Sequence, residues 1–358
     1  MTAVLHLSDV RKAYGASRAL DGVDLAIPAN SYVSLLGASG SGKTTLLRVI
    51  AGFEALDAGS IVLDGKRIDG SPAHRRGIGF VFQNFALFPH LSVAKNIAFG
   101  LANREDSPIT DRARRRDKVH EIIDLVGLGG LGERAVTQIS GGQRQRVALA
   151  RTLVTEPRLV LLDEPLGALD ANLRARMRTE LRAIRDRLGV TFLHVTGNES
   201  EALAMGDLVL VLDKGRIAQA ADSDTVYNKP AAPAVARFLN CYNVFDGALS
   251  GESFVSLAGA FPLGSGARRR AGQIAYAVRY DRIAVRPSSA SAAADEVKIE
   301  GLFVASEYSG ASVNSFFKLD DGQLMEVESH LSHRSPETYA AQERYSLVWK
   351  RDAALVFE

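Results

Sequence analysis

Apolar residues in the first two thirds of the chain form short uninterrupted runs separated by segments with helical spacing. The runs Tyr32–Leu36 and Leu159–Leu162 predict buried strands of a parallel sheet, and Thr44–Ala51 and Arg144–Val154 predict helices. Further strands are predicted at 4–10, 20–27, 60–63 and 77–82. The fold class expected for this part of the chain is therefore α/β.

Residues 91–155 have a different pattern, which predicts a helical insertion. Val119, Ile122, Ile123 and Val126 fall at helical spacing, and the segment 112–118 just before them is rich in Arg and Lys. We interpret the basic segment as a solvated helix face. Contact with anionic lipid or with a partner is the alternative.

From about residue 240 the pattern changes to short alternating runs. Strands are predicted at 272–278, 297–305, 312–319, 324–327 and 345–349, separated by turns such as 320–322. This pattern fits a small β-barrel of the oligonucleotide-binding (OB-like) type. We therefore expect two domains, residues 1–238 and 239–358, with a helical subdomain at about 86–156 inside the first.

Composition limits the classes of protein to which the chain can belong. At 358 residues and 46% hydrophobic it can build a substantial core, and a net charge of +2 argues against a general nucleic-acid binder. No apolar run approaches the roughly 18 residues that cross a bilayer, and residues 1–12 lack the apolar core of a secretion signal. Cys241 is the only cysteine, so no intramolecular disulfide can form, and we expect a cytosolic protein.

The segment Leu35–Leu47 reads LLGASGSGKTTLL and contains the pattern G-x-x-x-x-G-K-[ST] between a predicted strand and a predicted helix. Glycines allow backbone N–H groups to converge on a phosphate, and the helix N-terminus adds a partial positive charge. A flexible Gly/Ser surface loop is the alternative, which the flanking strand and helix disfavour. The residues expected to hold a nucleoside triphosphate are Gly37, Ser39, Gly40, Gly42, Lys43, Thr44 and Thr45.

Tyr14 precedes the turn at 15–17 between the first two predicted strands. If these strands flank the phosphate loop, its ring can stack on adenine, because every nucleobase offers a flat π-face. The alternative is a turn tyrosine packed on the sheet.

Polar residues follow two of the predicted strands. Gln83 follows the strand at 77–82, and Asp163 and Glu164 follow Leu159–Leu162. Ligands of parallel sheets bind beyond the carboxyl ends of the strands. Glu164 is expected to orient and polarise an attacking water, and Gln83 to reach this water or Mg²⁺ unless it is an ordinary surface glutamine. The expected ligands of Mg²⁺ are the Thr44 hydroxyl, Gln83 and Asp163.

A second phosphate-binding device is predicted at the segment Ile139–Gln143, which reads ISGGQ and leads directly into a predicted helix. Since one phosphate loop holds one nucleotide, this device is best explained by a nucleotide that another protomer holds. The alternative is a serine N-cap followed by turn glycines. The residues concerned are Ser140, Gly141, Gly142 and Gln143.

The order and spacing of these motifs over residues 3–235 resemble those of ATP-binding cassette (ABC) ATPases. The motifs are the phosphate loop, Gln83, Ile139–Gln143, the LVLLDEP segment 159–165 and the GALD segment 167–170. The resemblance implies a phosphate-loop (P-loop) NTPase cassette that forms a head-to-tail dimer. Each ATP then lies between the phosphate loop of one subunit and Ser140–Gln143 of the other, and Asp170 resembles the residue that links the two sites.

The chain departs from the family pattern at one position. Members usually carry a histidine after the next strand that contacts the γ-phosphate, and here Gly197 stands in its place. His194 lies about 10 Å back along the predicted strand and points to the opposite face, so it is a poor substitute. We expect slowed hydrolysis, or Asn198 or a water in the role of the histidine. Pairing with a different ATPase subunit that supplies a complete site is the alternative.

The segments 275–287, 301–323 and 347–350 resemble the regulatory (TOBE) barrel of bacterial importer ATPases. The resemblance implies a subunit on the cytoplasmic face of the bacterial inner membrane, as a homodimer or heterodimer, with two transmembrane permease subunits, an extracytoplasmic solute-binding protein and no nucleic acid. The apolar segment 85–88 is the predicted docking surface.

Three interpretations of the function are open at this point. The expected cargo of an importer is of the polyamine type (spermidine or putrescine), with ferric iron, sugar or glycerol phosphate as alternatives. A soluble cassette protein acting on ribosomes or nucleic acid is the second interpretation. The third is a soluble regulator with weak ATPase activity, which Gly197 keeps open.

Overall fold

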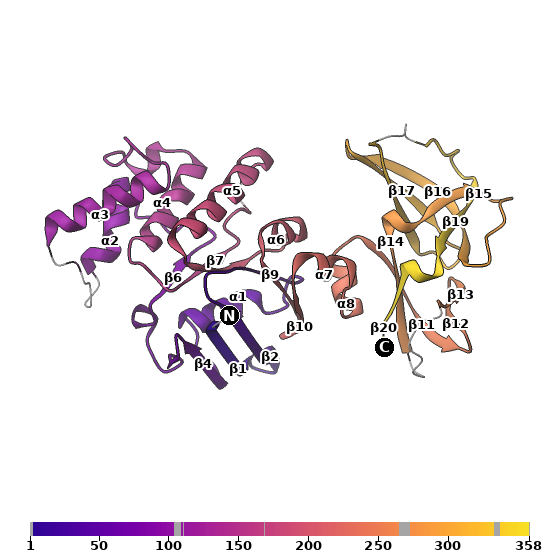
Figure 1. Cartoon of the computed structure of the whole chain (residues 1–358), viewed down its shortest axis with the longest axis horizontal. Coiled ribbons are helices and arrows are strands. Elements are labelled where there is room, and N and C mark those ends of the chain that lie inside the picture. The colour runs from indigo at the N-terminus through magenta and orange to yellow at the C-terminus, as the bar shows by residue number, and fades with distance from the viewer. Residues whose placement is uncertain are drawn as a thin grey trace. The chain divides into compact units, whose positions relative to one another are not determined.

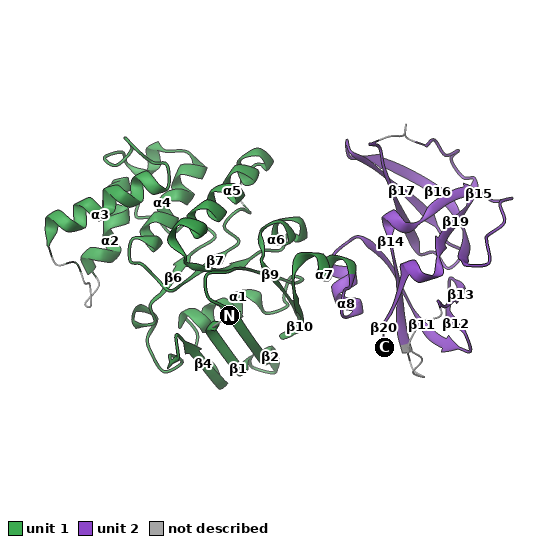
Figure 2. Ribbon diagram, viewed as in Figure 1, with its two compact units in different colours: residues 1–228 green, residues 229–358 purple. Residues whose placement is uncertain are grey.

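The computed structural model describes residues 3–103, 109, 111–167, 169–264, 273–332 and 337–357. The chain forms two compact units, residues 1–228 and 229–358 (Figure 2). The segment 229–238, which the sequence pattern assigned to the first domain, belongs to the second unit. There α8 (Pro233–Phe238) packs on β11 (Tyr242–Ser250) and β14 (Gln273–Arg279). Ala168 and Gly272, which lay in predicted elements or motifs, are outside the described residues.

A six-stranded sheet in the order β10-β9-β3-β8-β7-β6 forms the centre of the first unit (Figure 1). Neighbouring strands from β9 to β6 are parallel, and only β10 runs antiparallel to its neighbour. Strands covered on both faces are uninterruptedly apolar, which is why the sequence runs predicted β3 and β7 correctly, whereas β9 and β10 were not predicted. The bounds are β3 Tyr32–Leu36, β6 Ile78–Val81, β7 Leu159–Asp163, β8 Thr191–Val195, β9 Leu208–Asp213 and β10 Arg216–Ala221.

An antiparallel sheet in the order β2-β1-β4-β5 packs with α1 against one face of the central sheet. Its long hairpin turns at Gly15, whose φ of 59° suits the turn. The bounds are β1 Ala3–Tyr14, β2 Ser17–Pro28, α1 Lys43–Ala51, β4 Ala58–Leu63 and β5 Lys66–Arg67.

Helices cover the other face of the central sheet and share a second apolar core with it (Figure 1). The segment predicted as a helical insertion contains α2, α3 and α4, and Val119, Ile122 and Ile123 are buried in this core while Arg112, Arg114 and Arg116 are exposed. The bounds are η1 Ala73–Arg75, α2 Val93–Asn103, α3 Arg112–Leu125, η2 Val136–Gln138, α4 Gly141–Leu153, α5 Ala171–Leu188, α6 Glu199–Met205 and α7 Ser223–Asn228. None of the described helices is long and apolar enough to span a bilayer.

The second unit consists of two five-stranded sheets, in the orders β13-β12-β11-β14-β20 and β15-β19-β16-β17-β18. Their strand pairs are antiparallel, and both sheets contribute to one core. Within it the Trp349 indole donates a hydrogen bond of 2.7 Å to the Tyr276 hydroxyl. The remaining bounds are β12 Ser253–Ser256, β13 Gly259–Pro262, η3 Tyr280–Arg282, β15 Ala284–Pro287, β16 Glu296–Tyr308, β17 Ser312–Lys318, β18 Leu324–His330, β19 Arg344–Lys350, η4 Arg351–Ala353 and β20 Ala354–Phe357.

Candidate functional site

The carboxyl ends of four parallel strands bring the predicted site segments to one edge of the central sheet. The phosphate loop follows β3, Gln83 follows β6, Asp163 ends β7 and Gly197 follows β8. Segments that are far apart in the chain therefore meet where parallel sheets bind their ligands.

The phosphate loop is shaped by glycines that no other residue could replace without displacing the backbone. Gly42 precedes α1 with a φ of 106°, and a Cβ there would lie 2.4 Å from the Ala19 carbonyl oxygen. A Cβ on Gly37 would lie 2.3 Å from the Leu212 carbonyl oxygen. Glycine at these two positions therefore lets the loop lie close to β2 and β9, while Ser39 and Gly40 at its tip are exposed.

Lys43 lies under this loop. Its side chain is buried, and the ammonium group donates to the carbonyl oxygens of Gly37 at 2.7 Å and Ala38 at 2.9 Å. Burial lowers the pKa of Lys43, and the nearby carboxylates of Glu164 and Asp163 oppose this shift. The loop therefore carries a poorly solvated positive charge whose hydrogen bonds go to neutral carbonyl oxygens, and this arrangement favours an anionic ligand.

Gln83 and Glu164 are in direct contact. The Gln83 amide donates to the Glu164 carboxylate at 2.9 Å. Glu164 itself has a φ of 45°, and its N–H bonds the Val195 carbonyl oxygen on β8 at 3.0 Å. The side chain is thus held at the sheet edge by an uncommon backbone conformation and a partner amide.

Asp163 occupies the last position of β7 and is partly buried. Burial raises the pKa of Asp163, the Glu164 carboxylate raises it further, and the cations Arg48 and Lys43 lower it. Two adjacent carboxylates in a partly buried site favour the binding of a cation. The sequence interpretation did not include Arg48, although it lies one helical turn after Thr44 on α1.

Ser140 and Gln143 bond each other in a capping box at the start of α4. The Gln143 N–H donates to the Ser140 hydroxyl at 3.3 Å, and the Ser140 N–H donates to the Gln143 side-chain oxygen at 2.9 Å. Gly142 faces α5, where a Cβ would lie 2.9 Å from the Leu173 side chain. The capping role considered for this segment is therefore real, and Ser140 remains exposed for a second role.

Asp170 and Tyr14 lie at exposed positions. The Asp170 side chain caps α5 by accepting a hydrogen bond from the Leu173 N–H at 2.9 Å. The Tyr14 ring is 48% exposed, and the Lys12 ammonium lies 5.4 Å from its centroid. Tyr14 is the last residue of β1 and pairs with Ser17 on β2. Two residues further along β2, the carbonyl oxygen of Ala19 lies beside Gly42 of the phosphate loop.

His194 is not available at the site. It is fully buried, its Nδ1 lies 2.8 Å from the Tyr32 hydroxyl, and its Nε2 lies 2.8 Å from a Glu201 carboxylate oxygen. Gly197 is exposed, and a Cβ there would meet no heavy atom of the described residues within 4 Å. The Asn198 side chain caps α6 by accepting from the Glu201 N–H at 2.7 Å. A larger side chain would therefore fit at position 197, where this protein has glycine.

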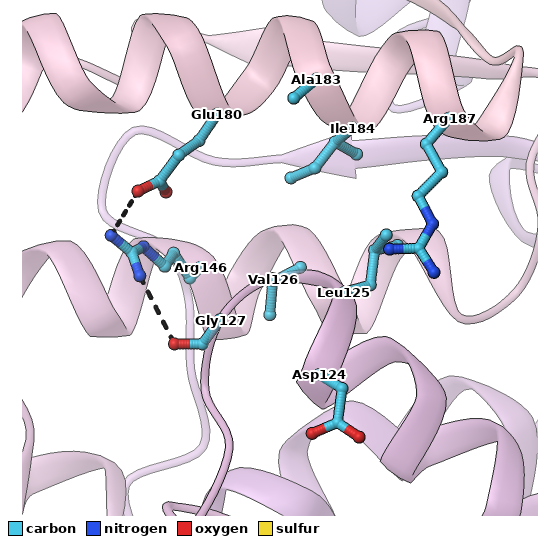
Figure 3. Close-up of a pocket in the computed structure, with 9 residues that line it drawn as sticks. All are labelled: Asp124, Leu125, Val126, Gly127, Arg146, Glu180, Ala183, Ile184 and Arg187. Carbon is cyan, nitrogen blue, oxygen red and sulfur yellow. Dashed lines mark hydrogen bonds and ion pairs between the residues drawn. The ribbon is translucent and has the colours of Figure 1, made fainter.

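A cavity of about 280 Å³ lies between the C-terminal end of α3, α4 and α5, away from the strand ends described above (Figure 3). Arg146 crosses it, donating to the Glu180 carboxylate at 2.7 Å and to the Gly127 carbonyl oxygen at 3.5 Å. The cavity belongs to the helical layer and contains none of the predicted site residues.

Comparison with known proteins agrees with this geometry. Residues 20–167 match the ABC transporter family and residues 276–357 match the TOBE domain. The chain is 39% identical over 354 residues to the uncharacterized ABC transporter ATP-binding protein YdcT of Escherichia coli, covering 98% of this chain and 97% of that protein. It is 43% identical over 323 residues to the sulfate/thiosulfate import ATP-binding protein CysA of Caulobacter vibrioides, covering 90% and 92%.

Further matches include the spermidine/putrescine import ATP-binding protein PotA of Clostridioides difficile, 45% identical over 244 residues and covering 68% of this chain and 69% of that protein. Among solved structures, the dimeric post-hydrolysis state of the ATP-binding cassette MJ0796 with ADP and Pi is similar, with a TM-score of 0.55 and 29% identity. The match covers 61% of this chain and 98% of that chain.

The chain therefore belongs to the ABC transporter family. It is an ATP-hydrolysing subunit with a P-loop cassette and a C-terminal TOBE domain of OB-like fold, as the resemblance in its sequence implied.

Proposed function

We propose that this chain is the ATPase subunit of a bacterial importer, in which two copies or near-copies enclose ATP and drive solute uptake. The observation that carries this proposal is the contact of 2.9 Å between Gln83 and Glu164, at the sheet edge that also presents the phosphate loop and Asp163. An amide and a carboxylate at this edge suit the orientation of a water that attacks a terminal phosphate.

Mg²⁺ fits the side chains present. The Thr44 hydroxyl, the Gln83 amide oxygen and the Asp163 carboxylate are hard oxygen ligands from three segments of the same edge. Burial and the neighbouring carboxylate disfavour the anionic form of Asp163, and a bound cation relieves both effects. When bound with ATP, Mg²⁺ neutralises phosphate charge, while Lys43 and the loop amides hold the phosphates and Glu164 orients water.

The Ser140–Gln143 segment, in which Ser140 is exposed, is assigned to the nucleotide of the second subunit. The Ser140 hydroxyl and the N-terminal end of α4 are suited to bind an anion. Asp170, which caps α5 close to this segment in the fold, is assigned to the link between the two sites. Tyr14 is assigned to the adenine ring.

We assign two permease subunits as the membrane partners of the chain, with an extracytoplasmic binding protein that delivers the solute. Under this assignment the chain lies on the cytoplasmic face of the inner membrane. Phe85 and Leu87 are partly buried against the helical core. In contrast, Phe53 and Phe82 are 49% and 36% exposed, and their stacked rings have centroids 5.7 Å apart. We therefore assign docking to this exposed aromatic pair rather than to the segment 85–88 alone.

Replacing Phe53 by Asp tests this assignment. We expect recovery of permease subunits with the chain from detergent-solubilised membranes to fall about 30-fold, because an interfacial aromatic contributes about 2 kcal/mol. ATP binding by the isolated chain should stay within about twofold, since Phe53 makes no contact with the phosphate loop among the described ring contacts. Leu257, 93% exposed in the second unit, provides the matched control Leu257→Asp, which should retain the permeases. Recovery of ribosomes, or undiminished permease recovery by Phe53→Asp, would contradict the assignment.

The proposed solute is a polyamine, with sulfate or thiosulfate as the competing class because relatives of similar identity carry either description. Uptake by cells that produce the wild-type chain or the Phe53→Asp variant distinguishes the two solutes. Uptake of labelled putrescine should fall with Phe53→Asp while uptake of labelled sulfate is unchanged, and the reverse result would replace the polyamine assignment.

Replacing Gly197 by His is expected to raise the kcat for ATP hydrolysis about tenfold, because a positioned polar side chain gains access to the γ-phosphate. The substitution fits, since a Cβ at 197 meets no described heavy atom within 4 Å. Steady-state hydrolysis by the purified chain measures the effect, with Gly197→Ala as the control for backbone stiffening. A kcat that His leaves unchanged would show that hydrolysis is not limited at this position.

A further inference from the structure

We propose that Arg151 is a positioning residue that ties the loop following Gln83 to helix α4, and thereby holds Gln83 in place against Glu164. Arg151 lies in the last turn of α4, whose first turn contains the Ser140–Gln143 segment. The sequence motifs described above do not include it.

The contacts of Arg151 are directed at another part of the chain. One terminal nitrogen of its guanidinium group donates to the Ala86 carbonyl oxygen at 2.7 Å, and the other donates to the Phe85 carbonyl oxygen at 2.9 Å. Its central carbon lies 5.6 Å from the centroid of the Phe88 ring. These partners precede Arg151 by 65 and 66 residues for the two hydrogen bonds, so the arginine does more than stabilise the end of its own helix.

The loop that Arg151 contacts has an unfavourable backbone conformation. Phe85 and Ala86 have φ values of 63° and 46°, in the left-handed region that residues with a side chain rarely adopt. Such conformations persist where the surroundings hold them. Two hydrogen bonds from a charged donor to the carbonyl oxygens of these two residues are strong enough to do so. Burial lowers the pKa of Arg151, yet a guanidinium group stays protonated at neutral pH.

A second side chain holds the next part of the loop. Asn96 on α2 is fully buried, accepts from the Phe88 N–H at 2.9 Å, and donates to the carbonyl oxygens of Phe88 at 3.1 Å and Leu91 at 3.2 Å. Helices α2 and α4 pack in the same core. The segment 85–91 is therefore attached to the helical layer by side chains from two helices.

This attachment links two parts of the site. Helix α4 has 13 residues and is about 20 Å long, and it carries Ser140 at one end and Arg151 at the other. Gln83 lies two residues before the first carbonyl group that Arg151 holds. The loop after Gln83 is therefore attached to the same helix that begins at Ser140.

The test is Arg151→Met, which keeps the length and apolar stem of the side chain but removes its donors. We expect amide hydrogen exchange within 85–91 to accelerate about tenfold, with exchange in the core of α4 unchanged. The kcat for ATP hydrolysis should fall about tenfold while the KM for ATP stays within twofold, because the phosphate loop is not altered. Arg151→Lys keeps the positive charge and can donate to one of the two carbonyl oxygens. It should therefore show smaller changes in both exchange and kcat than Arg151→Met.

Arg146→Met is the matched control. Arg146 is on the same helix and makes comparable bonds, but to Glu180 and Gly127 rather than to the loop after Gln83. It should leave exchange within 85–91 unchanged. Unchanged exchange in Arg151→Met, equal acceleration in Arg146→Met, or a KM effect without a kcat effect would overturn the proposal. The kinetic measurement rests on the proposed role of Gln83, whereas the exchange measurement does not, so faster exchange with normal kcat overturns the link to the reaction.

Discussion

Glu164→Gln is expected to lower the kcat for ATP hydrolysis by about 10²–10⁴-fold, the range for loss of a positioned general base. Gln has the size and shape of Glu and can keep the contact with Gln83 by rotating its amide, but it cannot polarise a water as a carboxylate does. It also tolerates the φ of 45° at this position as well as Glu does. The substitution therefore removes the chemistry while leaving the site geometry intact.

ATP affinity separates this expectation from misfolding. Equilibrium binding of a fluorescent ATP analogue to Glu164→Gln should remain within about twofold of the wild type, because the phosphate loop is untouched. Glu180→Gln, on α5 and paired with Arg146, is the control carboxylate and should retain normal turnover. If Glu164→Gln hydrolyses ATP at the wild-type rate, Glu164 does not have the assigned role.

Lys43→Ala is expected to weaken ATP binding by about 10- to 100-fold, because a charged hydrogen bond to a phosphate contributes about 1.5–3 kcal/mol. Lys43 is buried and its ammonium group donates to the neutral carbonyl oxygens of Gly37 and Ala38, so a phosphate oxygen is a stronger acceptor for it than its present partners. Hydrolysis at sub-saturating ATP should fall at least in proportion. Titration of the purified variant with the same fluorescent analogue measures the loss.

Lys66→Ala is the matched control, since Lys66 is an exposed lysine on β5 and should leave ATP affinity within about twofold. A thermal unfolding scan of each variant without nucleotide verifies that the fold is retained. Wild-type affinity in Lys43→Ala would show that the loop does not bind the triphosphate through this charge.

The parts of the fold that could be predicted from sequence are those with a local physical cause. Buried parallel strands such as Leu159–Asp163 are uninterrupted apolar runs, and the phosphate loop is defined by glycines at fixed spacing. The strands that were not predicted are β5, β9, β10, β11, β12, β13, β15 and β20. In β11, β12 and β13 polar and small residues such as Gly, Ser and Ala interrupt the alternation that marks a half-buried strand. The short apolar runs of β9 and β20 were overlooked.

The parts that could not be predicted depend on strand order. The contact between Gln83 and Glu164 joins residues 81 positions apart and requires β6 beside β7. The sequence excluded His194 from the site correctly, but it gave no partner for this residue. Its partners are Tyr32, which lies on the neighbouring strand β3, and Glu201 on α6. Arg151 was overlooked for the same reason, since its partners lie in a distant segment.

The reciprocal bonds between Ser140 and Gln143 fix the start of α4 before any ligand is present. The Gln143 N–H donates to the Ser140 hydroxyl oxygen, and the Ser140 N–H donates to the Gln143 side-chain oxygen. The hydroxyl hydrogen of Ser140 takes no part in these two bonds, so it can donate to a phosphate without breaking them. Under the role proposed for this segment, an opposing subunit would present its nucleotide to a preorganised helix terminus, which lowers the ordering cost of enclosing ATP.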